Sequence, residues 1–337
     1  MTVVQRYIGL DSPREWARAL KGIEHSFAHT WDSCYAMHLT TGFDTYLYCF
    51  EAQNARIVCP IAERTFGDHI DVVTPYGSSG FIGIGNRYDF SRYWTDYAKQ
   101  RNYVCGYIGL NPVFENDGYF DAEDVYEYND IFVIDLTMNI DGIFANLNNN
   151  RRRGLRKAQK DVPSQLTFDR DDLIKFFLAN YHDFFARKGA SQAYQFSNET
   201  LSFLLNRENT LIIGAEKAGR IEAVTVFAYT QYAADFLFNV SLSEGRQHSG
   251  PLLWSGIKHL KSLQIPLLNL GGGVLRNDNL AHFKRQFGGM QLPLRCLKQI
   301  YDTDTYETLC RQVDVDPTDM NGYFPAYQKP YNMRHSY

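Results

Sequence analysis

The chain has 337 residues, of which 45% are hydrophobic and 15% aromatic, with 34 Lys and Arg against 38 Asp and Glu. This length allows two domains of ordinary size, and the composition excludes global disorder. A net charge of −4 argues against a general nucleic-acid-binding role, because such proteins usually carry a basic excess. We expect a cytoplasmic protein without a membrane span, because no apolar run approaches the roughly 18 residues that a span requires.

The six cysteines and nine histidines show no spacing that is typical of a metal site. Several of the cysteines lie in apolar, strand-like runs such as "YLYCF" and "RIVCP". We therefore expect reduced thiols in a packed core, and no metal cofactor.

In chain order, the N-terminal half predicts a hairpin over 45–51 and 56–63, a strand over 69–76, a helix over 88–100, and strands over 103–110 and 131–136. The C-terminal half predicts an antiparallel meander over 209–216, 220–230 and 233–243, then a helix over 251–264. A short buried strand over 266–270, a glycine loop, a helix over 279–287 and a strand over 291–301 follow. The similar order of the two halves predicts an α/β protein with mixed sheets and a duplicated architecture. We place the domains at 1–138 and 139–337, with a junction helix over 139–160.

Six cations gather in the junction helix: Arg151, Arg152, Arg153, Arg156, Lys157 and Lys160. Helical spacing puts Arg151 on one stripe with Leu147 and Leu155 and places Arg152 and Arg156 beside it, whereas Arg153, Lys157 and Lys160 form a solvated face. A charge on an apolar stripe needs a partner, so we expect Arg151 to bind either an anionic ligand or a neighbouring carboxylate.

In two further segments, polar residues lie where the backbone can approach a ligand closely. In the first, "RQHSG" precedes a helix with Pro251 at its first position, and the free amides of such a helix start suit a pyrophosphate. In the second, Gly271, Gly272 and Gly273 allow a close approach of the backbone, and Lys284 follows on a short helix. Neither segment is G-x-G-x-x-G, which excludes a dinucleotide fold. A plain capped helix and a surface lysine remain alternatives.

Three segments together, "NNNRRRGLRKAQK", "RQHSGPLLW" and "NLGGGVLRNDNLAHFKRQFGG", resemble in order and approximate spacing the Fem-like branch of the GNAT (Gcn5-related N-acetyltransferase) superfamily. The C-terminal match runs from about 144 to 297, and "TPYGSSGF" and "GYIGLNPVFEN" extend it more loosely into the N-terminal half. The resemblance implies tandem GNAT-like domains and transfer of an acyl or aminoacyl group to an amine.

In the superfamily, the loop after the fourth strand binds the pyrophosphate of coenzyme A through backbone amides. The resemblance therefore implies an acyl-CoA site in the C-terminal domain, at Val240, Arg246, Gln247, Ser249, Gly250, Leu252 and Leu253. This loop departs from the usual Arg/Gln-x-x-Gly-x-Gly/Ala pattern, because Gly250 comes one place late and Pro251 replaces the second small residue.

The compact size, the net charge and the lack of a paired helical arm favour an N-acyltransferase acting on a dTDP- or UDP-linked amino sugar, in O-antigen or capsule biosynthesis. Arginine forks suit phosphate oxygens. The substrate-binding residues we predict are Tyr76, Arg151, Arg152, Gly271, Gly272 and Arg276. The alternatives are an aminoacyl-tRNA-dependent Fem-type peptidoglycan transferase and a non-catalytic tandem-GNAT binding protein.

For the mechanism, we expect direct attack of the neutral sugar amine on the thioester carbonyl, without a strong base. The oxyanion needs aimed donors. Lys284, which matches the lysine of the "FK-x-x-FG" motif in the Fem-like branch, and the backbone amides around Asn239 and Val240 are the predicted donors. His248 is the alternative base, although a histidine in such a loop is more often structural.

Overall fold

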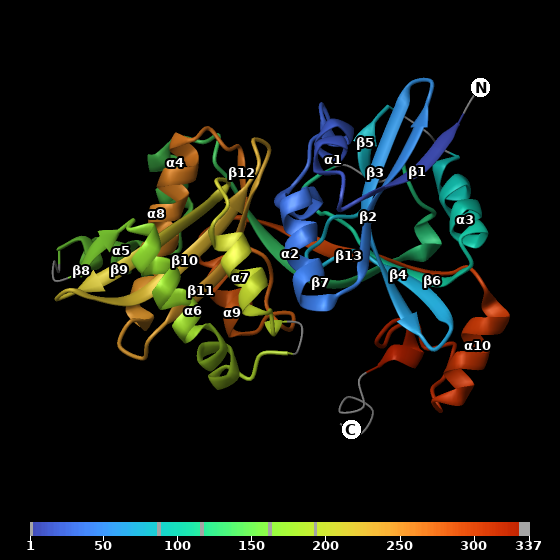
Figure 1. The fold of residues 1–337 in the computed structure, drawn as a ribbon. Helices are drawn as coiled ribbons and strands as arrows, with labels where there is room; N and C mark the ends of the chain where they lie inside the picture. Colours follow the sequence, from blue (N-terminus) through green and yellow to red (C-terminus); the bar gives the residue numbers. More distant parts are fainter. Residues whose placement is uncertain (1–2, 86–88, 115–117, 161–163, 192–193, 330–337) are drawn as a thin grey trace. The chain divides into compact units, whose positions relative to one another are not determined.

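The computed structural model describes residues 3–85, 89–114, 118–160, 164–191 and 194–329 (Figure 1). The chain divides into two compact units. Unit 1 comprises Met1–Glu24, Ala28–Tyr128 and Leu294–Tyr337, and unit 2 comprises His25–Phe27 and Asn129–Pro293. Within the described residues, no helix is both long and apolar enough to cross a membrane.

Unit 1 is a mixed sheet with helices. Its antiparallel strands are β1 (Val4–Gly9), β2 (Asp44–Ala52), β3 (Ala55–Phe66) and β4 (His69–Val73), with the short β5 (Ile82–Ile84) paired to β3. Strand β6 (Tyr103–Gly109) is parallel to β4, and residues 296–300 of β13 (Met290–Ile300) pair antiparallel to β6. Its α-helices are α1 (Pro13–Leu20), α2 (Trp31–Thr41), α3 (Phe90–Gln100) and α10 (Thr303–Gln312).

Unit 2 repeats the same order. Strands β8 (Ser164–Thr167), β9 (Thr210–Lys217), β10 (Arg220–Tyr229) and β11 (Ala234–Ser241) are antiparallel neighbours, and β12 (Leu267–Asn269) is parallel to β11. Residues 133–135 of β7 (Val125–Asp135) pair with β12. Its α-helices are α4 (Ile140–Asn146), α5 (Asn149–Lys160), α6 (Arg170–Arg187), α7 (Asn198–Leu205), α8 (Ser249–Ser262) and α9 (Asn279–Arg285). In each unit an antiparallel meander is followed by a helix and a parallel strand, so the predicted mixed α/β class and repeated order are confirmed.

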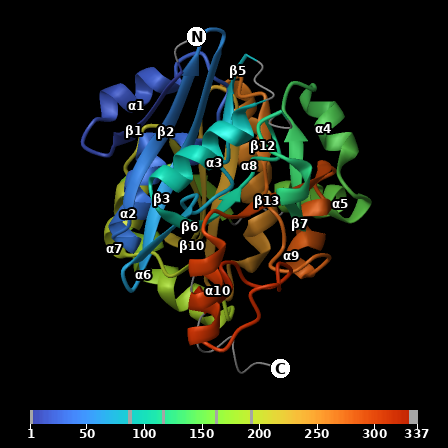
Figure 2. The ribbon, with the colours of Figure 1, turned by 90° about the vertical axis from the view of Figure 1, so that its right-hand side faces the viewer.

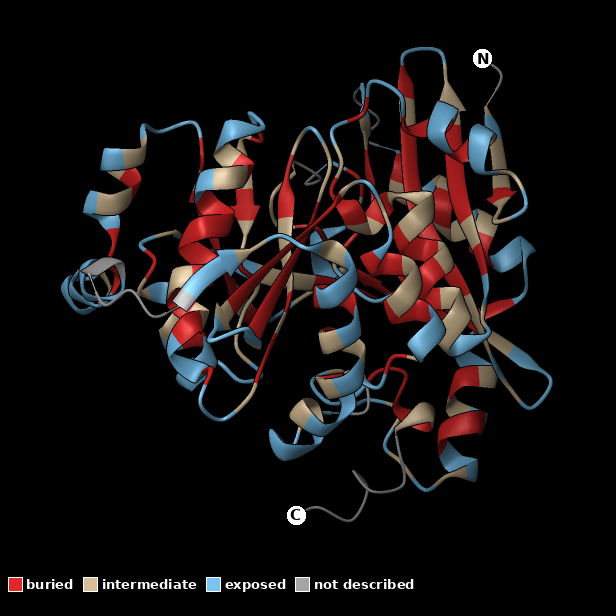
Figure 3. Cartoon of the chain, turned by 60° about the vertical axis from the view of Figure 1, so that its left-hand side comes forward, coloured by how far each residue is buried: buried red, intermediate tan, exposed pale blue. Residues whose placement is uncertain are grey.

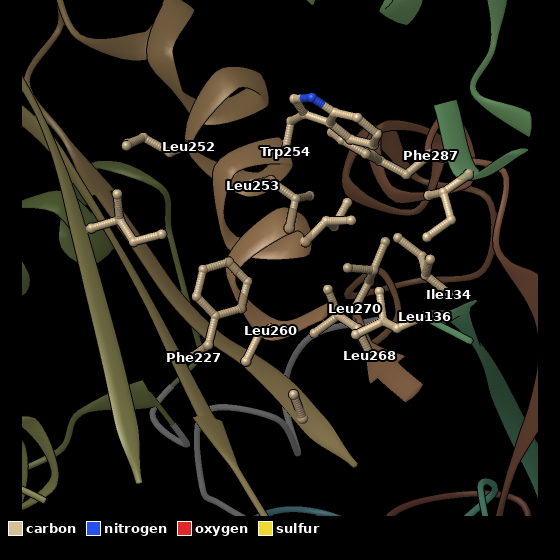
Figure 4. Close-up of a cluster of buried hydrophobic side chains, with 14 of the residues drawn as sticks. Ile134, Leu136, Phe227, Leu252, Leu253, Trp254, Leu260, Leu268, Leu270 and Phe287 are labelled. Carbon is tan, nitrogen blue, oxygen red and sulfur yellow. The ribbon is translucent and has the colours of Figure 1, made fainter. Parts of the chain in front are cut away.

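The core of unit 2 lies between α8 and the sheet. Leu252, Leu253, Ile257 and Leu260 fall at helical spacing and are fully buried, each contributing about 1.5–3 kcal/mol through the area removed from water. Phe227 of β10 points toward α8 (Figure 4), and a Cβ at Gly256 would lie 2.2 Å from its ring. Buried residues follow the strands and the inward helix faces, while the outward faces are exposed (Figure 3). This packing holds the start of α8 in a defined position.

The predicted junction helix is two helices, which is a correction. Leu147 ends α4 with an extended backbone, at φ −60° and ψ 144°. The Asn148 side chain then accepts a hydrogen bond from the Asn150 amide (2.8 Å), which caps the start of α5. An Asn that can bond to the backbone competes with helix continuation, so the chain breaks there (Figure 2). Because of this break, the cations lie on α5, a helix separate from α4.

The boundaries of the compact units differ from the predicted domain ranges. Residues 294–337 group with unit 1 rather than with the C-terminal half, because β13 pairs with β6, from Cys296 opposite Gly109 to Ile300 opposite Cys105. Near the predicted domain boundary, the boundary between the two compact units lies between Tyr128 and Asn129, inside β7. Strand partners far apart in the sequence decide this grouping, and periodicity along the chain does not report them.

Candidate active site

An open strand edge is the main feature of unit 2. Strands β11 and β12 pair at only two positions, Ala234 with Leu268 and Asp235 with Asn269. Strand β12 then ends, and Gly271 turns the chain at φ +69°, while β11 continues to Ser241. Among the described strands, none pairs with β11 on this side beyond Asp235. Alternate N–H and C=O groups of this β11 edge are therefore available to a ligand.

A bulge accompanies the opening. Phe236 pairs with Phe227 and Phe238 pairs with Val226, which leaves Leu237 as an extra residue in β11. Bulges re-aim backbone and side chains and are common beside active sites. The backbone of β11 is therefore locally re-aimed where the strands separate.

The matching parallel pair in unit 1 is closed. The Thr74 amide donates to the Tyr107 carbonyl (3.1 Å), and the Gly109 amide donates to Thr74 Oγ1 (3.0 Å). Gly80, at φ +63°, lies so close to the next segment that a Cβ there would be 2.9 Å from Leu110 Cα. Within unit 1, the segment that follows β4 therefore occupies the position equivalent to the open β11 edge of unit 2.

The start of α8 is tied to the sheet by side chains. A 3₁₀ turn over Arg246–His248 leads directly into α8, so the helix begins at Ser249, two residues before the predicted start. Ser249 Oγ donates to Asn239 Oδ1 (3.0 Å), and Asn239 Nδ2 donates to Thr225 Oγ1 (2.7 Å). Asn239 therefore positions the helix start. The Ser249 amide there already donates to the Arg246 carbonyl, so it is the positive end of the helix dipole that favours an anion.

His248 pairs with a carboxylate. Its Nε2 lies 2.9 Å from Glu222 Oε2, and both side chains are about nine-tenths buried, at 9% and 10% exposure. This contact fastens the 3₁₀ turn to β10. Neither contact of His248 involves Lys284, so the sequence-predicted catalytic residues Lys284, Asn239 and His248 do not form one cluster.

Arg151 of α5 meets the start of α8. Its guanidinium stacks on Phe283 and Phe287, with centroids 4.5 and 4.8 Å away, and donates to Gln286 Oε1 (2.8 Å). A Cβ added at Gly250 would lie 2.6 Å from Arg151 Nη1. Its Nε has no partner, burial lowers its pKa, and no Asp or Glu of the described residues pairs with it. A cation and a positive helix end therefore converge without an anion between them.

Lys284 of α9 is buried at the turn that follows β12. Its Nζ donates to the Gly272 carbonyl (2.7 Å) and lies 5.9 Å from the centroid of the Phe236 ring. The side chain is 7% exposed, and this burial lowers the pKa of Lys284 to about 8, with a smaller opposing effect from Asp278. A rise of about 3.3 Å per strand residue puts Phe236 some 10 Å before Asn239. The β11 amides nearest Lys284 are thus those around Phe236, rather than those of Asn239 and Val240.

The other predicted residues have varied positions. Val240, Leu252 and Leu253 are core side chains, whereas Arg246 and Gln247 are exposed on the 3₁₀ turn. Arg152 bonds within its own segment, to the Ala145 carbonyl and to Asn149, and Arg276 lies 3.7 Å from Asp130. Tyr76 is 41% exposed in unit 1. Arg153, Arg156 and Lys157 are exposed, and the Lys160 side chain lies outside the described part of the chain.

Several residues of the site escaped sequence reasoning: Asp235, Phe236, Gln286 and the partners Phe283 and Phe287. One signal was present, because Asp235 is the only charge in the apolar run "ADFLFNVS". Among the described residues, no three His, Cys, Asp or Glu side chains gather closely enough to hold a metal ion.

Gly250→Ala provides a local test of the Arg151 contact. The new methyl group would meet the flexible end of Arg151, at 2.6 Å from Nη1, so the guanidinium should move while the fold stays intact. We expect unfolding free energy to change by under about 1 kcal/mol and anion affinity to fall several-fold. Urea unfolding measures the stability, and titration with coenzyme A measures the affinity. An unchanged affinity would show that Arg151 does not contact the anion.

The fold described above is similar to those of several solved structures. FemX superposes with a TM-score of 0.69 and 10% identity, covering 90% of this chain and 99% of FemX. The C-terminal domain of a putative lysylphosphatidylglycerol synthetase from Agrobacterium fabrum gives a TM-score of 0.58 at 14% identity, covering 89% and 96%. L-PGS from Bacillus licheniformis gives 0.54 at 13% identity, covering 86% and 92%. These likenesses confirm the predicted fold.

No protein-family model and no curated protein matches the sequence.

Proposed function

We propose that unit 2 transfers an acyl group from a thioester donor to an amine. The observation that carries this proposal is the β11 edge, which presents unpaired backbone groups between the buried Lys284 at one end and the start of α8 at the other. A linear donor with an anionic end suits such a site. The anion binds at the helix start, and the acyl carbonyl lies near Lys284.

The anion site favours a diphosphate-bearing donor such as acyl-CoA. Arg151 and the positive end of the α8 dipole supply positive charge, and among the described residues no Asp or Glu pairs with Arg151. The sequence analysis assigned Arg151 to a nucleotide sugar. Its contact with Gly250 supports a role with the donor instead.

Lys284 supports the chemical step. When the amine nitrogen attacks the acyl carbon, negative charge develops on the carbonyl oxygen, and a pre-positioned ammonium group stabilises it. The Lys284 ammonium is held by the Gly272 carbonyl, so it needs little reorganisation. The carbon–sulfur bond then breaks, and the thiol leaves.

For the acceptor, we propose an amino sugar on a dTDP or UDP carrier, with Arg276, Arg152, Gly271 and Gly272 of unit 2 as the residues to test. This assignment rests on the family resemblance of the sequence. The likeness in fold to FemX and the exposed cations Arg153, Arg156 and Lys157 of α5 support a second candidate, a Fem-type transfer from aminoacyl-tRNA.

One experiment separates these functions. Unfolding temperature is measured with free CoA, acetyl-CoA and longer acyl-CoA, each with and without UDP- and dTDP-linked amino sugars, and with charged tRNA. A donor at about 100 times its Kd should stabilise the protein by about 2.7 kcal/mol. Pairs that shift are then assayed for thiol release and product mass. Transfer from charged tRNA alone, with steep salt dependence, would select the Fem-type function, and no shift with any donor would contradict both.

A further inference from the structure

Asp235 is a charged residue in the largely apolar strand β11. Its neighbours Ala234 and Phe236 both belong to the core under α8. Side chains alternate along a strand, so the Asp235 carboxyl lies on the opposite face of the sheet. It also occupies the last pairing position between β11 and β12, opposite Asn269. Asp235 therefore stands where the two strands separate, at the end of the β11 edge nearest Lys284.

The surroundings of this carboxyl group are neutral. Asn269 Nδ2 donates to Asp235 Oδ1 (2.9 Å), and the Phe27 backbone amide donates a second hydrogen bond. Burial raises the pKa of Asp235 to about 6, against the opposing effect of these two donors. Among the described residues, no Lys, Arg or His pairs with it. Of the titratable groups on neighbouring segments, His25 packs against Tyr232 with the ring centroids 5.3 Å apart, and Lys284 Nζ lies 5.9 Å from the Phe236 ring centroid, on the other face.

We propose that Asp235 is the general base of the transfer, taking the proton from the acceptor amine as its nitrogen attacks the acyl carbon beside the β11 edge. This inference rests on the proposed function and deepens it. The new carbon–nitrogen bond forms while the amine proton passes to the carboxylate. The carbon–sulfur bond breaks, and Asp235 returns the proton to the departing thiolate, so the net products are an amide and a free thiol.

A purely structural role explains this residue less well. Both of its partners are neutral N–H donors, and an Asn side-chain oxygen could accept them without burying a charge. A carboxyl group that ionises near neutrality, without a cation, is instead suited to proton transfer. The opposite faces also keep Asp235 from pairing with Lys284, so one group can stay anionic while the other stays cationic.

Asp235→Asn tests the proposal, because it keeps the shape and the accepting oxygen but cannot take the proton. The assay uses the CoA thioester and amine pair that the wild type turns over, followed by thiol release from pH 5 to 9. We expect kcat/KM to fall about 10²- to 10⁴-fold and the acidic limb near pH 6 to disappear. Asp183→Asn, at an exposed position of α6, is the matched control and should keep wild-type values.

Asn269→Ala provides a measurement that would not change if Asp235 had only a structural role. Removing the amide donor disfavours the charged carboxylate, so the acidic limb should shift to higher pH. The Gly271 amide also loses its acceptor, Asn269 Oδ1 (2.7 Å), so the position of the limb is compared and not the rate. An Asp235→Asn variant with wild-type kcat/KM and an unchanged limb would overturn the proposal. So would a loss of rate in Asp235→Asn with no shift of the limb in Asn269→Ala, which would make Asp235 structural. No transfer by the wild type itself would instead refute the proposed function on which the inference rests.

Discussion

Replacing Lys284 with Met should lower kcat about 10²- to 10³-fold while making the folded protein at least as stable at pH 7 as the wild type. Methionine keeps the unbranched apolar body of the side chain as far as Cε but has no ammonium group to stabilise an oxyanion. The donor should still bind, because we assign its anion to the start of α8, so the loss should appear in kcat rather than in KM.

The stability effect follows from the pKa of Lys284. Burial lowers it from the usual 10.5 to about 8, so between these two pH values the unfolded chain binds more protons than the folded one. Stability of the wild type therefore rises with pH through this window, and the cost of the buried charge is fully present below pH 8. That cost is about 3 kcal/mol, and losing the hydrogen bond to Gly272 offsets about 1 kcal/mol of the gain.

Urea unfolding at pH 7 and at pH 10 measures this difference. The variant should be about 1–2 kcal/mol more stable at pH 7, and the advantage should shrink at pH 10. Lys258→Met, at an exposed position of α8, is the control and should change neither stability nor kcat. An unaltered kcat in Lys284→Met would remove this residue from the mechanism. A large destabilisation would show that its role is structural.

Arg151→Glu should weaken donor binding about 100-fold or more. The carboxylate would lie against the start of α8, where the helix dipole stabilises it, and it would occupy the position that we assign to the donor anion. Placing like charges side by side costs several kcal/mol. The fold should tolerate the change, because Arg151 contributes one hydrogen bond and stacking on Phe283 and Phe287.

Isothermal titration with coenzyme A at two salt concentrations measures the effect. Arg153→Glu makes the same change of charge two residues away, on the exposed face of α5, and serves as the matched control. It should lower affinity only slightly, and less so at high salt. Equal losses in both variants would indicate a general electrostatic effect instead of a specific contact, and no loss in Arg151→Glu would return Arg151 to a packing role.

The split of the six cations shows how far periodicity extends. Spacing of three and four residues predicted that Arg151 faces inward and Arg153 and Lys157 outward, and the described side chains agree. Arg156, which was predicted to flank Arg151, is exposed. Spacing could not predict the partners of Arg151, because Phe283, Gln286 and Gly250 lie about 100 residues or more further along the chain. The tertiary contacts give Arg151 no carboxylate partner among the described residues, and its binding of an anionic ligand stays a prediction.

Local patterns were least informative about side-chain pairing. The sequence predicted His248 as an alternative base because it lies in a polar loop. In the structure, its imidazole pairs with the buried Glu222 of β10. Asp235 attracted no notice, because an isolated charge in a strand has no meaning until the separation of β11 and β12 is known. The course of the last strand was missed for the same reason, since β13 pairs with β6 through residues nearly 200 positions away.

The sequence by itself determined the kinds of elements, the repeated order and the Fem-like resemblance of this protein. Apolar periodicity and turn residues act over a few neighbouring positions, and the order of motifs is written along the chain. Only the tertiary structure decided that the parallel strands separate in unit 2 and stay closed in unit 1, and that Lys284 and Asp235 approach the β11 edge from opposite faces. Strand pairing, burial and the resulting pKa shifts depend on groups that the fold brings together from distant positions.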